Sequence, residues 1–171
     1  MRNSLTSVLA GDLAFVALVY VAALLLGIGL NSLRSVPLPL VPKLPEERLL
    51  EGLEVPVFAK IKLPGAIELE GAMTAHHEHQ AIFIDARARA FFDLSHIPEA
   101  RSLPRETFHT DFPAFARQTD KHQRLIVYCS GEDCDDSTVV AKALARLGFE
   151  NVTIFKGGWE EWSAAGLLKE P

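Results

Sequence analysis

The sequence predicts an α/β domain, built on a parallel sheet of about five strands flanked by helices, and one transmembrane helix that precedes it. From residue 65 onward, short apolar runs alternate with amphipathic segments, an order typical of parallel sheets covered by helices. Near the N-terminus, the eighteen residues Leu13–Leu30 carry no charge, and a helix of that length crosses the hydrocarbon layer of a bilayer. With 171 residues, 49% of them hydrophobic, the chain has room for one globular core and a smaller appendage.

The N-terminal part divides where its composition changes. The uncharged run continues to Leu33 and ends at Arg34. A cleaved signal peptide would have a more basic start than Arg2 alone, so we expect an uncleaved anchor. The next stretch holds six of the ten prolines, and we interpret it as a mostly extended stem. Its EERLLEGL segment is compatible with one or two helical turns, and residues 57–63 alternate like a half-buried strand, so the stem has residues with which to pack on the domain. The expected segments are an N-terminal tail over residues 1–12, a transmembrane helix over residues 13–33, a Pro-rich stem over residues 34–64 and the domain over residues 65–171.

Within the domain, two apolar runs at residues 81–84 and 125–128 are each followed directly by polar residues. They predict strands that are buried on both faces. A shorter run at residues 152–154 predicts a third strand, and Gly148 is a suitable C-terminal stop for the helix before it. The expected helices cover residues 69–78, 88–94, 105–118, 138–147 and 159–165.

The domain is acidic. Residues 65–171 contain eleven Lys and Arg against seventeen Asp and Glu, a net charge of −6 with His neutral. Such a surface repels nucleic acid and anionic lipid, so we expect no nucleic-acid partner and a membrane link through residues 13–33 alone. The Lys and Arg that flank the apolar run are too evenly divided to orient it in the membrane. The two cysteines, Cys129 and Cys134, are too close in sequence to staple a fold, which indicates chemistry.

Cys129 directly follows a predicted strand and begins a loop that leads into a helix. Reactive groups of open parallel sheets collect at this carboxyl edge. Backbone N–H groups at the start of that helix, which we expect Asp136 or Ser137 to cap, favour an anion there. A thiolate should therefore form more easily than in a free cysteine, whose pKa is about 8.5. Asp85 and Arg87 follow another predicted strand and should lie near the same edge.

Three separated motifs carry a family resemblance. The first runs IDARARAFFDLSHIPEARSLP and contains Asp85, Arg87 and His96. The second runs LIVYCSGEDCDDSTVVAKALARLGF, and the third runs NVTIFKGGWEEW with Gly157 and Gly158. In their order, these motifs resemble a rhodanese-like sulfurtransferase domain that extends from about residue 65 to residue 166.

The resemblance implies covalent catalysis in which the Cys129 thiolate attacks a sulfane sulfur, becomes a persulfide and passes the sulfur on. It implies a small sulfur donor and a thiol or cyanide-like acceptor, with a protein acceptor also open, and neither a cofactor nor a metal. Related anchored proteins imply a single-pass protein of the cell membrane with an extracytoplasmic domain. The expected site comprises Cys129 as nucleophile, the loop residues Ser130, Gly131, Glu132, Asp133, Cys134, Asp135, Asp136 and Ser137, and the supporting residues Asp85, Arg87, His96, Gly157 and Gly158.

The loop CSGEDCDDS departs from the family pattern, in which a shorter loop often ends in Arg or Lys. Its four carboxylates should oppose a dianionic donor such as thiosulfate and favour a persulfide or polysulfide. Phosphatases of this fold need an Arg six positions after the cysteine, where this chain has Asp135, so we do not expect phosphoryl transfer. The carboxylates either complement the helix start and face water, or bind a divalent cation.

Cys134 leaves more than one function open. A small residue facing the core is one interpretation. The other is a second thiol that forms a disulfide with Cys129, resolves a persulfide, or shuts the site off under oxidation. The sequence is therefore compatible with a sulfane-sulfur transferase or carrier, with a thiol redox or sulfide-sensing module, and with a non-catalytic docking domain.

Overall fold

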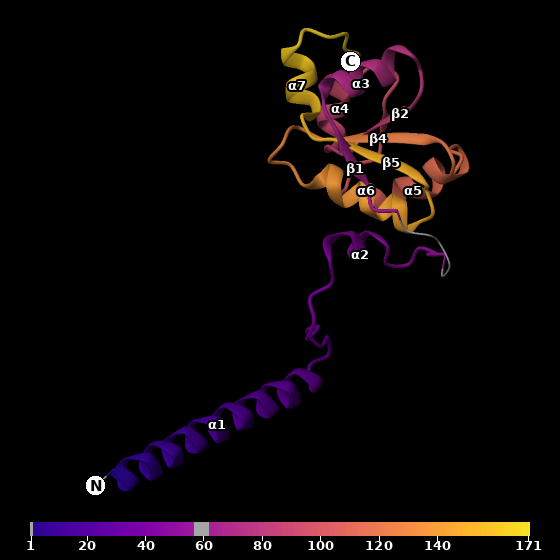
Figure 1. The fold of residues 1–171 in the computed structure, drawn as a ribbon. Helices are drawn as coiled ribbons and strands as arrows, with labels where there is room; N and C mark the ends of the chain where they lie inside the picture. Colours follow the sequence, from indigo (N-terminus) through magenta and orange to yellow (C-terminus); the bar gives the residue numbers. More distant parts are fainter. Residues whose placement is uncertain (1, 57–61) are drawn as a thin grey trace. The chain divides into compact units, whose positions relative to one another are not determined.

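The computed structural model describes residues 2–56 and 62–171 (Figure 1). The chain divides into two compact units, Met1–Pro42 and Lys43–Pro171. Most of the strand expected over residues 57–63 lies outside the described residues.

The first unit is dominated by one long helix, α1 (Arg2–Ser32). Its segment Asp12–Ser32 has a mean hydropathy of 2.7, and none of that apolar stretch is buried within the protein. The helix is long and apolar enough to cross a membrane, a property that a signal sequence near the N-terminus would share. Near the end of the helix, the Asn31 side chain binds the segment that follows. Its amide group donates to Leu38 O and its oxygen accepts from Leu38 N–H, both at 2.8 Å.

The second unit is built on a parallel sheet of five strands, as the sequence predicts. The strand order is β1-β5-β4-β2-β3, and the central strand β4 pairs with its neighbour β2 from Leu125 opposite Ile82 to Tyr128 opposite Asp85. The two strands that were not expected, β1 and β3, lie at the edges and have three residues and two residues, too few to show a hydrophobic period. The strands are β1 (Gly65–Ile67), β2 (Ile82–Asp85), β3 (Arg101–Ser102), β4 (Arg124–Tyr128) and β5 (Asn151–Phe155).

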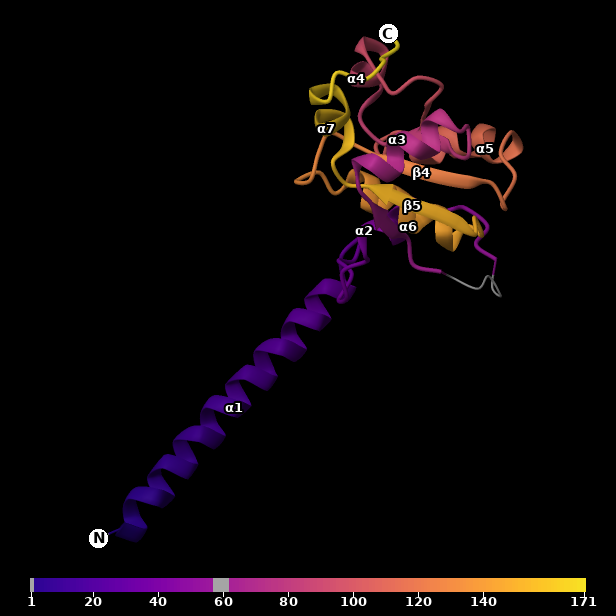
Figure 2. The ribbon, with the colours of Figure 1, turned by 45° about the horizontal axis from the view of Figure 1, so that its top comes forward.

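Helices cover both faces of the sheet, and Figures 1 and 2 show α3 and α6 on opposite sides of it. Side chains of α3 and α7 pack in one apolar cluster, whereas those of α2, α5 and α6 pack in the other. The central strand β4 divides its side chains between the two, with Ile126 and Tyr128 in the first cluster and Leu125 and Val127 in the second. The helices are α2 (Pro45–Leu49), α3 (Leu69–His77), α4 (Arg89–Leu94), α5 (Phe108–Arg117), α6 (Asp136–Arg146) and α7 (Gly158–Ala164).

The short helix α2 lies in the segment interpreted as a stem and contributes to the core of the second unit. Leu49 and Leu50 are buried in the cluster that includes α6. Arg146 of α6 reaches back to both acids of α2, with 3.8 Å to Glu46 and 3.2 Å to Glu47. Burial of the two leucines and these ion pairs attach the segment to the domain.

The order of the strands sets the place of the site. From β4 the chain passes through α6 to β5 on one side, and from β2 it passes through α4 to β3 on the other. The loops that follow β4 and β2 therefore diverge at the carboxyl edge of the sheet, the position at which open parallel sheets place their reactive groups. Cys129 and Asp85 lie at this edge, one residue after β4 and at the last residue of β2.

Candidate active site

Backbone hydrogen bonds hold Cys129 in place at the end of β4. Its side chain is only 1% exposed, so the thiol position belongs to the interior rather than to the surface. The first turn of α7 donates to the start of the loop, with Trp159 N–H 2.8 Å from Cys129 O and Glu160 N–H 2.8 Å from Ser130 O. These two bonds satisfy carbonyls that have left the sheet, and they fix the direction in which the loop departs.

Gly158 is the residue that allows α7 to approach so closely. Its φ is +58°, and a Cβ at this position would lie 2.4 Å from Cys129 O. Both the backbone angle and the contact exclude a side chain there. Gly157 is also crowded, because a Cβ there would lie 2.8 Å from the Cβ of Glu161 and still closer to its carboxyl group, although no positive φ is required at this position.

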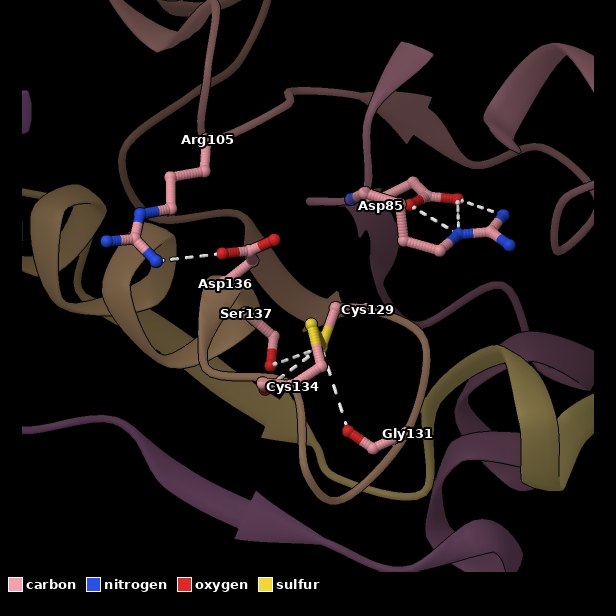
Figure 3. The surroundings of a disulfide bond; sticks show 8 residues. Asp85, Arg105, Cys129, Gly131, Cys134, Asp136 and Ser137 are labelled. Carbon is pink, nitrogen blue, oxygen red and sulfur yellow. Dashed lines mark hydrogen bonds and ion pairs between the residues drawn. A yellow bond between two sulfur atoms is a disulfide. The ribbon is translucent and has the colours of Figure 1, made fainter. Parts of the chain in front are cut away.

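Cys129 and Cys134 form a disulfide across the loop, with 6.3 Å between their Cα atoms (Figure 3). The polar neighbours of Cys129 Sγ are Cys134 O at 3.0 Å, Ser137 Oγ at 3.5 Å and Gly131 O at 3.8 Å. Two of these three atoms are carbonyl oxygens, which accept from a thiol and oppose a thiolate, whereas the Ser137 hydroxyl can donate to one. The backbone N–H groups expected to favour an anion are therefore not among the polar neighbours of Cys129 Sγ while the disulfide is closed.

An open hollow of about 530 Å³ lies over the loop. Cys134 reaches it, together with backbone of the loop and the first turn of α7. Its acidic side chains are Glu132 and Asp133 from the loop and, from α7, Glu160 and Glu161. The α7 pair was not foreseen, since only the tertiary approach of α7 places it beside the cysteine loop. The hollow favours neutral or cationic ligands over anions.

The other two acids of the loop, Asp135 and Asp136, lie at the start of α6. Asp135 is the N-cap residue and makes no side-chain cap hydrogen bond, so the expected cap by Asp136 or Ser137 is wrong by one or two positions. Asp136 instead pairs with Arg105, with 2.9 Å between Nη1 and Oδ1. Ser137 is buried beside Cys129 Sγ. In the described part of the chain no group of three or more His, Cys, Asp or Glu side chains is arranged to hold a metal ion.

Arg105 is a site residue that the sequence analysis missed. It follows the unexpected edge strand β3 by three residues, and Figure 3 shows its side chain reaching toward Asp136 beside the disulfide. The position at the carboxyl edge of a parallel strand is the signal that could have identified it. Arg105 therefore neutralises one of the four acids that follow Cys129, but it does not line the hollow over the loop.

Asp85 and Arg87 form a buried ion pair behind the loop. Asp85 is fully buried and Arg87 is 5% exposed; Arg87 Nε and Nη2 both donate to the carboxylate, the shortest contact being 2.6 Å. The guanidinium lies 4.9 Å from the Trp159 ring centroid and 5.8 Å from that of Tyr128. Burial, and then the charge of Asp85, raise the pKa of Tyr128, whose neutral hydroxyl accepts from Ile97 N–H at 3.2 Å.

His96 contacts Phe92 and the C-terminal segment of the chain rather than the disulfide. Its Nδ1 lies 2.9 Å from Phe92 O, and its ring stacks on that of Phe92 at 3.7 Å. Its backbone pairs in both directions with Glu170 near the C-terminus. These contacts indicate that His96 holds the end of the chain against the domain.

A known family matches this arrangement. The family model described as a rhodanese-like domain matches residues 66–165, which include the strand, the cysteine loop and the first turn of α7. The chain belongs to the rhodanese-like family. The resemblance of the three motifs to a rhodanese-like domain is therefore confirmed.

Relatives of this rhodanese-like chain include two groups of enzymes. The 3-mercaptopyruvate sulfurtransferase of Escherichia coli strain K12 is 30% identical over 148 residues, covering 74% of this chain and 52% of that protein. The tRNA uridine(34) hydroxylase of Sodalis glossinidius is 25% identical over 116 residues, covering 66% and 32%. The chain thus spans about half or less of the length of these curated relatives. Among solved structures, the BH2092 protein from Bacillus halodurans matches with a TM-score of 0.56 and 26% identity, covering 63% of this chain and 77% of that one.

Replacing Gly158 tests the close approach of α7. Gly158→Ala should lower the free energy of unfolding by about 1–3 kcal/mol more than Gly166→Ala, because the new methyl group collides with Cys129 O. Gly166 is the matched control, since its φ is +70° but its Cβ would enter open space, so that variant carries only the backbone cost of about 1 kcal/mol. Urea denaturation of the full chain in detergent, followed by tryptophan fluorescence, measures both; equal losses would contradict the contact.

Proposed function

We propose that this protein transfers or carries sulfane sulfur as a persulfide on Cys129. The single observation that carries the proposal is the position of Cys129: it is the first residue after the central strand, at the carboxyl edge of a rhodanese-like sheet, on a loop fixed by α7. Proteins of this architecture place their reactive groups at that point. The similarity to a 3-mercaptopyruvate sulfurtransferase supports the same chemistry, over about half of that enzyme.

The transfer step is a thiolate displacement. The Cys129 thiolate attacks the outer sulfur of a donor persulfide R–S–SH, and the donor leaves as R–S⁻, so Cys129 becomes the persulfide Cys129–S–SH. The Ser137 hydroxyl, at 3.5 Å, is placed to donate to the thiolate before the attack. An acceptor nucleophile then takes the outer sulfur and returns Cys129 to the thiolate. The step needs neither a metal nor a cofactor.

The charge of the hollow selects the donor. Glu132, Asp133, Glu160 and Glu161 all line the space over the loop. A dianion such as thiosulfate is repelled there, whereas a donor with no net charge or a positive charge is not. We infer that the physiological donor is a small persulfide rather than thiosulfate or an anionic keto acid, and that a nucleic-acid substrate is excluded by the same charge.

The disulfide favours a second candidate function, a thiol redox module that uses Cys129 and Cys134. In that function the loop would alternate between dithiol and disulfide without carrying sulfur. A docking domain without chemistry is the third candidate, and the acidic hollow would then be its contact surface.

Cys134→Ser separates the candidates, because the disulfide cannot form and a persulfide on Cys129 is retained. The full chain in detergent, reduced and freed of reductant without oxygen, is given cysteamine persulfide, which carries no net charge when ionised. Intact mass should increase by one sulfur atom in Cys134→Ser and stay unchanged in the double variant Cys129→Ser/Cys134→Ser. No added sulfur in Cys134→Ser would overturn the proposed function, and a reversible disulfide in the unsubstituted chain would then favour the redox module.

Charge removal in the hollow tests the choice of donor. Glu160→Gln/Glu161→Gln should raise the kcat/KM for thiosulfate by about three- to tenfold at low ionic strength, and by less in high salt, since two repulsive charges are lost. The kcat/KM for cysteamine persulfide should change little. The matched control is Glu78→Gln/Glu150→Gln, which removes two exposed acids before β2 and β5, about 15 Å away at the opposite edge of the sheet. An equal gain in the control would show that net charge alone is responsible.

We also propose that α1 remains attached as a single-pass anchor of the cell membrane, with the rhodanese-like domain outside the cytoplasm. The support is the apolar composition of Asp12–Ser32 and the lack of buried surface on it. A phosphatase that is active only after export, fused after Pro171, should be active, and the fusion should stay in membranes washed with alkaline carbonate. An inactive phosphatase would reverse the orientation, and a soluble product with a shortened N-terminus would identify a signal sequence.

A further inference from the structure

We propose that Cys134 gives the protein a reductive activity: it resolves the persulfide on Cys129, so that the sulfane sulfur is released as hydrosulfide and the loop is left as a disulfide. This inference rests on the proposed function, because it needs the persulfide to form first. It adds a product, hydrosulfide, and a co-substrate, an external dithiol, to the transfer of sulfur.

The loop already brings the two sulfurs together. The Cα atoms of Cys129 and Cys134 are 6.3 Å apart, within the range of about 4.4–6.8 Å that disulfides span. The approach comes from a turn inside the loop, in which Cys134 N–H donates to Gly131 O at 3.1 Å. Cys129 is attached to β4 and α7, and this turn places Cys134 against it. An intramolecular attack of this kind needs no encounter with a second protein.

The burial of the two cysteines decides which nucleophile reaches Cys129 Sγ. Cys129 is 1% exposed, whereas Cys134 is half-buried and lines the hollow. Once the loop has curled over Cys129, an acceptor from solution meets Cys134 first. The intramolecular thiol therefore has the advantage over any external one for attack on the inner sulfur of the persulfide.

The acidic side chains of the hollow also favour resolution of the persulfide by Cys134. Anionic acceptors such as sulfite and cyanide are repelled by Glu132, Asp133, Glu160 and Glu161, so transfer of sulfur to them is slow. Hydrosulfide is itself an anion, and the same charges drive its departure into solvent. The charge of the site therefore favours release of hydrosulfide over transfer of sulfur to an external anionic acceptor.

Atoms and electrons balance in each step. The Cys134 thiolate attacks Sγ of Cys129–S–SH, a bond forms between the two cysteine sulfurs, the S–SH bond breaks, and the outer sulfur leaves as HS⁻. The outer sulfur gains two electrons and the two cysteine sulfurs lose them. To repeat the cycle, an external dithiol attacks the accessible Cys134 sulfur, Cys129 leaves as a thiolate, and the second thiol of the reductant completes its own disulfide. A reaction class that supplies reducing equivalents as dithiols must therefore act beside this protein.

A single-turnover experiment on the full chain in detergent tests the resolving role. Reduced protein, freed of reductant without oxygen, receives one equivalent of cysteamine persulfide; released sulfide and intact mass are then measured. The unsubstituted chain should release one sulfide per chain and lose the mass of two hydrogen atoms. Cys134→Ser should release none and gain one sulfur atom, and Cys129→Ser should do neither. Once the persulfide has formed, the first-order rate constant of release should not depend on protein concentration, as an intramolecular step requires.

The outcomes keep the two proposals apart. If Cys134→Ser gains sulfur but the unsubstituted chain also keeps its sulfur and releases no sulfide, Cys134 does not resolve and only this inference is overturned. It is likewise overturned if Cys134→Ser releases as much sulfide as the unsubstituted chain. If Cys134→Ser gains no sulfur at all, the proposed function fails and this inference fails with it. Cys134→Ala, with its fold checked by circular dichroism, replaces Cys134→Ser should that variant not fold.

Discussion

The site depends on the contact between the first turn of α7 and the end of β4. Trp159 N–H and Glu160 N–H bind the two carbonyls with which the cysteine loop leaves the sheet. The contact exists because Gly158 has no side chain and accepts a positive φ. It fixes the start of the loop while leaving the rest free to curl, and it brings the acids of α7 to the hollow. One backbone contact therefore sets both the position of Cys129 and the charge around it.

The buried ion pair of Asp85 and Arg87 supports the contact between α7 and the end of β4, because Arg87 packs against Trp159 of α7. Two charges inside a protein are costly unless they are paired and held by further hydrogen bonds, and this pair has both. Asp85 accepts from Arg87 N, Nε and Nη2, and Arg87 also donates to Ser95 O at 2.9 Å. Because the guanidinium also lies against the Trp159 ring, the loop after β2 and the first turn of α7 are held to each other. The pair is thus a structural support for the cysteine loop, without contact to the disulfide.

Features that depend on local sequence are predictable for this chain, whereas features that depend on tertiary packing are not. The strands β2, β4 and β5 are buried apolar runs, and Cys129 is identified by following one of them. The edge strands β1 and β3 are too short to show a period, and Arg105 was missed with β3 because its importance comes from that edge position. Glu160 and Glu161 are ordinary acids in a helical pattern, and only the packing of α7 turns them toward the cysteine loop. The disulfide between Cys129 and Cys134 was one of several alternatives, because the spacing of two cysteines in the sequence does not determine the conformation of the loop between them.

The attachment of α2 defines the smallest fragment that keeps its core covered. The family match begins at residue 66, yet Leu49 and Leu50 pack against the side of the sheet that α6 covers. A truncation at residue 66 would strip these leucines away, expose an apolar strip on α6 and leave Arg146 without its acidic partners. Such a surface promotes self-association. Soluble fragments for crystallisation or solution spectroscopy should therefore begin near Lys43, where the compact unit begins.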